Sequence, residues 1–192
     1  MFNLVNSEQG SKIARMRKLK TEELNRPDVQ EFKAIEKLPV VVILDNVRSM
    51  HNVGSTFRTG DAFAITGIAL CGITAQPPHR EIHKTALGAT ESVDWKHYEN
   101  TQAACEALRA DGYQIMAIEQ VENSVLLQDF KPKHDQKLAI VFGNEVFGVE
   151  EEIVALADGC IEVPQFGTKH SLNISVTVGV VLWDLVTKIK LN

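Results

Sequence analysis

Two unbroken apolar runs constrain the fold more than any other feature of this sequence. Residues 40–44 (VVVIL) and 138–142 (LAIVF) contain no polar residue. Such runs are typical of strands that are covered on both faces, as in a parallel sheet between layers of helices. Shorter, mostly apolar segments at 68–71, 93–95, 113–118 and 160–163 are candidate strands, and they alternate with helix-like segments. The sequence therefore predicts an α/β fold with a largely parallel sheet and helices on both faces.

The first 38 residues differ in character from the rest of the chain. Residues 1–20 contain five Lys or Arg side chains and one Glu, whereas the whole chain has a net charge of −5. Helical spacing at 11–24 and 29–37 predicts two short helices before Pro39. We expect a basic helical extension over 1–38 and a domain over 39–192. The extension could contact RNA or only a dimer partner, and a solvated helix face would explain its charge equally well.

Several classes of protein are disfavoured by composition. No apolar run approaches the roughly 18 residues of a membrane span, and no signal peptide opens the chain, so we expect a cytoplasmic protein. The odd number of cysteines and their wide spacing indicate buried thiols in a reducing compartment, at Cys71, Cys105 and Cys160. His79 and His83 have helical spacing, but Arg80 stands where a zinc protease motif needs Glu. We therefore predict no metal site.

Polar residues gather near the ends of three strands: Asn52 and Arg58, Gly143 and Glu145, and Ser171 and Asn173. Ligands of open α/β sheets bind at the carboxyl ends of the strands, which makes these loops candidates for one site. Each residue also has a simpler structural interpretation. Asn52 is a candidate N-cap for the helix after the first strand, and Ser171 or Asn173 for the last helix (172–189). Arg58, about a turn and a half into its helix, could form only a surface ion pair.

The order and spacing of these loops resemble the three motifs of the SpoU/TrmH family of RNA ribose methyltransferases, in the SPOUT superfamily. The first motif runs from DNVR at 45–48 through NVG at 52–54 to FRTGDAF at 57–63. The second is VFGNE at 141–145 with Gly148, and the third joins Val163-Pro164 and Gly167 to SLNIS at 171–175. The resemblance spans about 38–190, and three ordered motifs are far more specific than one.

The resemblance implies properties that periodicity alone does not predict. The C-terminal segment should form a deep trefoil knot, which is a rare exception among folds. S-adenosylmethionine should bind in that knot, with walls at Ile118, Glu119, Gly143, Val163 and Leu172. Family members are homodimers whose active site receives Arg58 from across the interface. The implied reaction is methyl transfer to a ribose 2′-hydroxyl of tRNA or rRNA.

The resemblance also suggests a role for each polar residue. Arg58 would hold a phosphate and stabilise negative charge on the 2′-oxygen; because a guanidinium stays protonated, we favour this role over that of general base. Asn52 would orient Arg58 or the substrate, and Glu145 would hold Asn52 or Arg58. Ser171 and Asn173 would position substrate and cofactor.

Two positions of this sequence depart from the family pattern. Asn144 stands where Ser, Pro or Gln is frequent and Gln165 where Met is usual; both positions act mainly through backbone.

Two other functions are weaker alternatives. A dinucleotide-dependent oxidoreductase would need GxGxxG after the first strand, and NVGS at 52–55 does not supply it. A non-catalytic RNA-binding module would not need all five polar residues of the predicted site.

Overall fold

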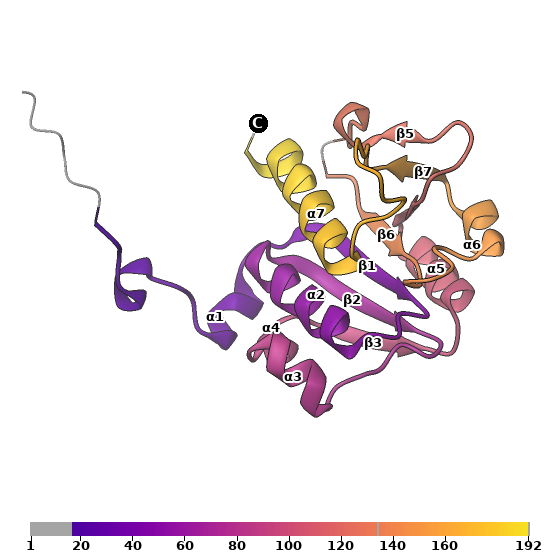
Figure 1. The fold of residues 1–192 in the computed structure, drawn as a ribbon. Helices are drawn as coiled ribbons and strands as arrows, with labels where there is room; N and C mark the ends of the chain where they lie inside the picture. The colour runs from indigo at the N-terminus through magenta and orange to yellow at the C-terminus, as the bar shows by residue number, and fades with distance from the viewer. Residues whose placement is uncertain (1–16, 134, 192) are drawn as a thin grey trace, which may run out of the picture.

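The computed structural model describes residues 17–133 and 135–191 and shows an α/β fold (Figure 1). Seven strands form one sheet in the order β3-β2-β1-β6-β4-β7-β5, and every adjacent pair is parallel. The strands are β1 (Leu38–Asp45), β2 (Ile65–Cys71), β3 (Trp95–Tyr98), β4 (Gln114–Ile118), β5 (Val125–Leu126), β6 (Leu138–Phe142) and β7 (Gly159–Glu162). The predicted parallel sheet is confirmed.

Helices connect these strands and cover both faces of the sheet. They are α1 (Val29–Ala34), α2 (Met50–Ala62), α3 (Arg80–Ala86), α4 (Ala89–Ser92), α5 (Thr101–Ala110), α6 (Glu151–Leu156) and α7 (Ile174–Lys190), with short 3-10 helices η1 (Thr21–Leu24) and η2 (Leu127–Asp129). None of the helices in the described part of the chain is long and apolar enough to cross a lipid bilayer.

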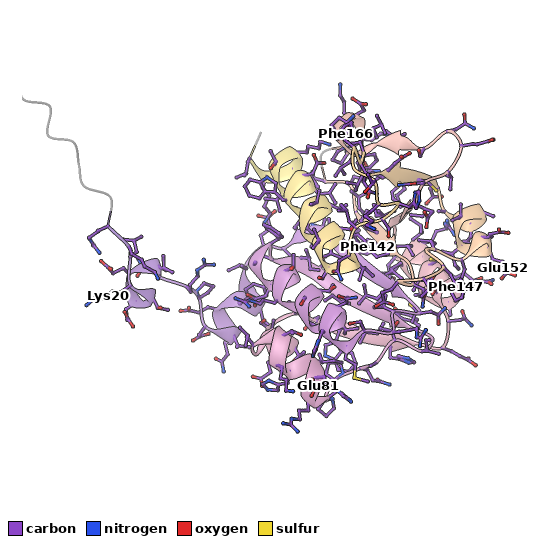
Figure 2. All side chains as sticks on the ribbon, viewed as in Figure 1. Lys20, Glu81, Phe142, Phe147, Glu152 and Phe166 are labelled. Atoms are coloured by element: carbon purple, nitrogen blue, oxygen red, sulfur yellow. The ribbon has the colours of Figure 1, made fainter. Side chains whose placement is uncertain are left out.

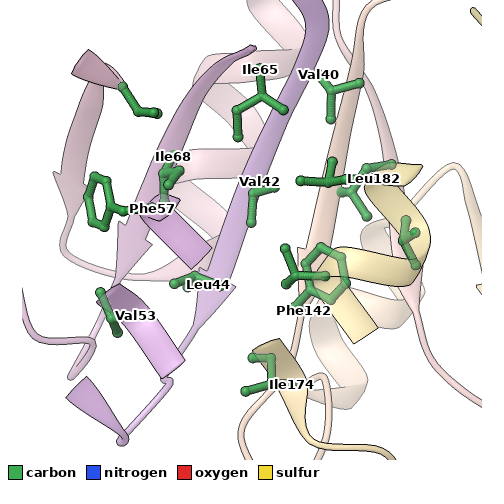
Figure 3. Close-up of a cluster of buried hydrophobic side chains, with 14 of the residues drawn as sticks. Val40, Val42, Leu44, Val53, Phe57, Ile65, Ile68, Phe142, Ile174 and Leu182 are labelled. Atoms are coloured by element: carbon green, nitrogen blue, oxygen red, sulfur yellow. The ribbon is translucent and has the colours of Figure 1, made fainter. Parts of the chain in front are cut away.

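Strand β1 contributes to two hydrophobic cores because successive side chains point to opposite faces. Val40, Val42 and Leu44 belong to the core under α2 and α7 (Figure 3). Val41 and Ile43 belong to the core on the α5 and α6 side. The unbroken apolar run at 40–44 is therefore explained by burial on both faces, as predicted.

Buried thiols were also predicted, and two of the three cysteines fit that expectation. Cys71 and Cys105 are buried, whereas Cys160 is only partly buried. Burial raises the pKa of Cys71 to about 12 and that of Cys105 to about 11. Both thiols are therefore protonated near neutral pH and belong to the core rather than to a reactive site.

Several element boundaries differ from the sequence prediction. The short strand expected at 93–95 lies at Trp95–Tyr98, and the second strand begins at Ile65 rather than 68. Residues 80–92 form two helices and not one, because Leu87 and Gly88 both have positive φ and interrupt the helix. Strand β5 and helix η2 were not predicted, because a two-residue strand has no periodicity to detect.

The N-terminal segment also differs from its prediction. A helix was expected over 11–24; residues 11–16 lie outside the described residues, residues 17–20 have no regular structure, and only Thr21–Leu24 form a 3-10 turn. Arg17 of this segment forms an ion pair with Glu23. In Figure 1 this N-terminal segment extends away from the domain, and the chain first packs against the domain at α1. There Phe32 is buried in the core. The domain boundary at residue 38 stays a prediction.

Glycine at position 54 allows α2 to lie against α3. A Cβ atom there would meet the Ile82 carbonyl oxygen at 2.3 Å and Thr85 Oγ1 at 2.1 Å. The Ile82 carbonyl oxygen is a backbone atom that cannot turn aside, so the close crossing of the two helices requires Gly54. This crossing sets the position of the α2 N-terminus, from which one side of the candidate site is built.

Candidate functional site

A cavity of about 790 Å³ opens at the carboxyl ends of β4, β6 and β7. Its volume lies in the range of small-molecule and cofactor sites. All five residues predicted to contact the cofactor line it, namely Ile118, Glu119, Gly143, Val163 and Leu172. These residues come from three loops far apart in the sequence. The structure brings the predicted set together around one cavity, and their role in cofactor binding stays a prediction.

The charge of this cavity suits a cationic ligand. Its described lining contains Glu119, Glu145 and Glu151 and no Lys or Arg. Apolar side chains such as Ile118, Val163 and Leu172 form other parts of the wall. The combination fits S-adenosylmethionine, whose sulfonium and ammonium groups are positive and whose adenosine is largely apolar on its faces. The same lining provides no cation for an RNA phosphate.

Glu145 is the residue that joins the first and second polar loops. Its Oε1 accepts hydrogen bonds from the Ser49 N–H at 3.0 Å and from Asn52 Nδ2 at 2.9 Å. Its Oε2 accepts from the Arg48 N–H at 3.0 Å. The carboxylate therefore satisfies backbone N–H groups at the start of α2, where a helix leaves donors unpaired and favours negative charge.

These three donors change the acidity of Glu145. Burial alone would raise its pKa, but hydrogen bonds from the Arg48 and Ser49 N–H groups and from the Asn52 amide stabilise the carboxylate. The net effect is a pKa below the ordinary value of 4.5. Glu145 is thus held ionised at neutral pH and acts as an acceptor that organises the loops.

A pH dependence follows from this lowered pKa. A carboxylate whose pKa is depressed on folding stabilises the native state above its unfolded pKa and loses that effect as pH falls through its folded pKa. We expect Glu145→Gln to be less stable than the wild type at neutral pH, because the amide nitrogen of Gln cannot accept both backbone donors. The gap in melting temperature should shrink as pH falls from about 6 to about 3. Thermal melts of both proteins across this range test it, and a constant gap would contradict it.

Asn52 extends the connection to the third polar loop. It is buried, and its Oδ1 accepts a hydrogen bond from Asn173 Nδ2 at 3.2 Å while its Nδ2 binds Glu145. Asn173 Oδ1 in turn accepts from the Ser175 N–H at 2.9 Å and caps α7. Glu145, Asn52 and Asn173 therefore form one hydrogen-bonded chain through all three loops predicted from the sequence.

One capping prediction is corrected by this geometry, and for the other the structure decides between the two predicted residues. The N-cap of α2 is Ser49, whose hydroxyl accepts from the Asn52 N–H at 3.3 Å. Asn52 is not the cap but the third residue of the helix. Its amide is therefore free to bridge Glu145 and Asn173. In the third loop Asn173 is the cap, and the helix begins at Ile174 rather than 172. Ser171 lies in the preceding loop, exposed, on the cavity wall.

Arg58 is not beside this cavity within one chain. It lies in the ninth position of α2, more than two turns from the helix start, because the helix begins at Met50. It lines a second cavity of about 510 Å³, formed with α1 and the turn between α3 and α4. Within a single chain Arg58 therefore lies apart from Glu145, Ser171 and Asn173, which line the first cavity. Glu145 holds Asn52 and not Arg58.

The loop after β6 is a tight hairpin held by Asn144. Its backbone exchanges hydrogen bonds with Gly148, its Oδ1 accepts from the Val146 N–H at 2.8 Å, and its Nδ2 donates to the Asn46 carbonyl at 2.7 Å. Asn144 was expected to act mainly through backbone, and its side chain in fact fixes the turn that carries Glu145. The exposed tip of this hairpin is Phe147 (Figure 2).

Asp45 is a buried carboxylate whose role the sequence analysis missed. It ends β1 and is fully buried. Its oxygens accept hydrogen bonds from the Thr101 hydroxyl, from Asn46 Nδ2 at 3.1 Å and from the Glu150 N–H at 3.2 Å. It therefore ties the starts of α5 and α6 to the end of β1. An acidic residue directly after an apolar strand was the available signal.

The histidines around α3 show no metal centre. His79 Nδ1 accepts from the Glu81 N–H and caps α3, and His51 pairs with Glu81 at 3.1 Å. Among the described residues no group of three or more His, Cys, Asp or Glu side chains is arranged to hold a metal ion.

Comparison with known proteins finds similarity to RNA methyltransferases. Residues 39–183 match the model of the SpoU rRNA Methylase family. A tRNA (guanosine(18)-2′-O)-methyltransferase of Thermus thermophilus is 29% identical over 163 residues, which cover 84% of this chain and 81% of that protein. One from Borreliella burgdorferi is 28% identical over 77% of this chain and 66% of its own length. The 23S rRNA (guanosine-2′-O-)-methyltransferase RlmB of Vibrio parahaemolyticus is 28% identical over 91% of this chain and 68% of that protein.

Solved structures share the fold. The A. aeolicus TrmH/SpoU tRNA modifying enzyme superposes with a TM-score of 0.73 and 26% identity, over 83% of this chain and 80% of that one. An AdoMet-bound rRNA methyltransferase from Sinorhizobium meliloti gives a TM-score of 0.72 and 28% identity, over 81% of this chain and 59% of that one. This likeness implies the predicted knot in the C-terminal segment.

Proposed function

This chain belongs to the SpoU rRNA methylase family, and from that membership we infer that it transfers the methyl group of S-adenosylmethionine to a ribose 2′-hydroxyl of tRNA or rRNA. The observation that carries the inference is the hydrogen-bonded chain from Glu145 through Asn52 to Asn173 at the edge of the acidic cavity. This chain of hydrogen bonds joins the three loops that carry the family motifs. We propose that the protein acts in the cytoplasm.

The residues divide the chemistry between them. S-adenosylmethionine supplies an activated methyl group, so the protein must align the 2′-oxygen with it and stabilise the charge that develops on that oxygen. Ser171 and Asn173 lie on the cavity wall, where they would orient the ribose. Glu145 fixes Asn52 and the start of α2. Arg58 would hold the adjacent phosphate and the developing negative charge.

This division of roles requires a second copy of the chain. The cavity has no cationic side chain in its described lining, and Arg58 lies in a different cavity of the same chain. A phosphate next to the reacting ribose would therefore meet carboxylates but no Lys or Arg side chain of the described lining in one subunit. An Arg58 contributed by a partner subunit would supply the missing charge, and we propose a homodimer with two shared active sites.

The C-terminal helix offers the surface for such a dimer. One face of α7 is buried in the core by residues including Val178, Leu182 and Leu185. The opposite face is apolar as well, with Val176, Val180 and Trp183 exposed by 51%, 40% and 56%. A helix that is apolar all round is normally buried on all sides, and these three residues share one face by their spacing. A second copy of this chain fits the uncovered face.

A charge on that face should separate the subunits. We expect Val180→Glu to convert the protein to a monomer and to remove methyl transfer, because a buried unpaired carboxylate in the interface is strongly unfavourable. Light scattering after size exclusion would measure the mass. Val125→Glu is the matched control, since Val125 is a similarly exposed valine (42%) that lies on the edge strand β5 and not on α7. A dimeric and active Val180→Glu protein would contradict this interface.

The function itself is tested by methyl transfer. The purified protein is incubated with methyl-labelled S-adenosylmethionine and either unmodified tRNA or rRNA, and the RNA is digested to nucleosides for mass spectrometry. A 2′-O-methylnucleoside is the expected product. RNA binding without any transfer would indicate the non-catalytic module instead, and a methylated base would contradict the ribose assignment.

A further inference from the structure

The second cavity, which contains Arg58, has features that the methyl-transfer chemistry does not require. It measures about 510 Å³ and lies between α1, α2 and the α3–α4 turn. Figure 1 shows α1 beside α4, next to the segment that leads to the N-terminus. One wall, residues 26–35, lies outside the 39–183 match to the family. The cavity therefore combines a residue of the first family motif with a segment that lies outside the 39–183 match.

Three apolar side chains of this cavity are exposed. Val29 and Ile35 of the α1 segment are 42% and 43% exposed, and Leu87 of the α3–α4 turn is 64% exposed. Phe32 lies deeper and is buried. Apolar walls that face a solvent-filled cavity are typical of a binding site for a flat or apolar group.

Leu87 is an unusual residue for its position. It is the C-cap of α3 with a φ of 49°, in the left-handed region where Gly or Asn is normally found. A leucine there costs backbone energy, and its exposed side chain recovers little by burial. Strain of this kind occurs at functional sites, so the position suggests that the side chain binds something.

Some charged side chains of the cavity form hydrogen bonds within the protein and others do not. Asp28 is the N-cap of α1 and accepts hydrogen bonds from two backbone N–H groups, and Asp61 accepts one from the Ser92 hydroxyl. The side chains of Arg26, Arg58 and Glu91 form no hydrogen bond or ion pair with other residues in the part of the chain that the structure describes. Two free guanidinium groups and one free carboxylate thus border an apolar cavity.

This combination fits a nucleotide. The guanidinium groups can bind phosphate oxygens bidentately, the apolar walls can cover the faces of a base, and a carboxylate can accept from an amino group of a base. We propose that the cavity takes the RNA nucleotide next to the methylated one, with its base against Leu87 and its phosphate on Arg26 and Arg58. The proposal rests on the proposed function, because it uses the same Arg58. It makes residues 26–35 part of the substrate-selecting surface.

Two substitutions test the base and the phosphate separately. Leu87→Asn removes the apolar wall, and because Asn tolerates the left-handed conformation it should not destabilise the fold. We expect it to raise KM for the methyl-accepting RNA about fivefold or more, with a smaller change in kcat. Arg26→Ala should reduce the slope of log affinity against log salt by about one, and Arg26→Lys should restore that slope.

Matched controls separate these effects from general ones. Leu191→Asn removes a leucine of equal exposure (63%), and Arg80→Ala removes an arginine of α3; neither residue lines the cavity. Both controls should behave as the wild type, and all variants should keep wild-type affinity for S-adenosylmethionine in calorimetry. The RNA in every assay is unmodified tRNA or rRNA, whichever the wild type methylates.

The outcomes also separate this proposal from the proposed function. If the wild type transfers methyl groups but Leu87→Asn leaves KM unchanged and Arg26→Ala leaves the salt slope unchanged, the nucleotide site is refuted and the enzyme function stands. If the wild type methylates neither RNA, the enzyme function itself fails, and with it this proposal.

Discussion

Replacing Arg58 by alanine should lower the rate of methyl transfer by at least about a hundredfold, because the variant lacks the one cation that the acidic cavity needs near the reacting oxygen. The affinity for S-adenosylmethionine should stay within about twofold, since Arg58 does not line that cavity. Single-turnover transfer and calorimetry measure the two quantities. Arg58→Lys should give an intermediate rate, because lysine keeps the charge but not the bidentate geometry. Equal rates for wild type and Arg58→Ala would remove Arg58 from the mechanism.

A mixing experiment shows from which subunit Arg58 acts. Arg58→Ala subunits are co-expressed with subunits whose cavity is blocked by Gly143→Val. In a shared site, each mixed dimer joins an intact cavity from one subunit to Arg58 of the other. About a quarter of the wild-type activity should then return, since half of the dimers are mixed and each has one working site. If Arg58 acts within its own chain, mixed dimers contain no working site and no activity returns.

The second large effect is expected at Gly143. A Cβ atom there would lie 2.0 Å from the carbonyl carbon of Gly148 and 2.1 Å from the Val149 nitrogen. Both are backbone atoms that cannot turn aside, so the hairpin that carries Glu145 would have to move. We expect Gly143→Ala to weaken S-adenosylmethionine binding at least about tenfold and to destabilise the fold by about 1–3 kcal/mol.

The chain offers a matched control for this substitution. A Cβ atom at Gly167, in the loop before α7, would meet nothing within 4 Å. Gly167→Ala should therefore keep both cofactor affinity and stability. Calorimetry with S-adenosylmethionine and thermal melts of both variants give the comparison. Wild-type affinity in Gly143→Ala would show that this hairpin is not part of the cofactor site.

The sequence predicted the candidate residues better than their contacts. Asn52, Glu145 and Asn173 were identified from motif order and polarity, and the structure joins them by hydrogen bonds. The partners of Glu145 at Arg48 and Ser49, about 97 residues away, could not be predicted because no local pattern specifies which loops meet. The N-cap was misplaced by three residues because Ser49 and Asn52 are both good caps and only backbone geometry decides between them.

By itself the sequence determined the buried strands, the alternation with helices and the three polar loops. These properties follow from local composition, since a side chain's polarity and branching reflect the burial of its own segment. Only the tertiary structure decided that β6 lies between β1 and β4, which brings the loops after β1 and β6 together at Glu145. It alone placed Arg58 in a cavity shared with α1. Both outcomes depend on the order of strands and the packing of helices, which are set by contacts between residues distant in the chain.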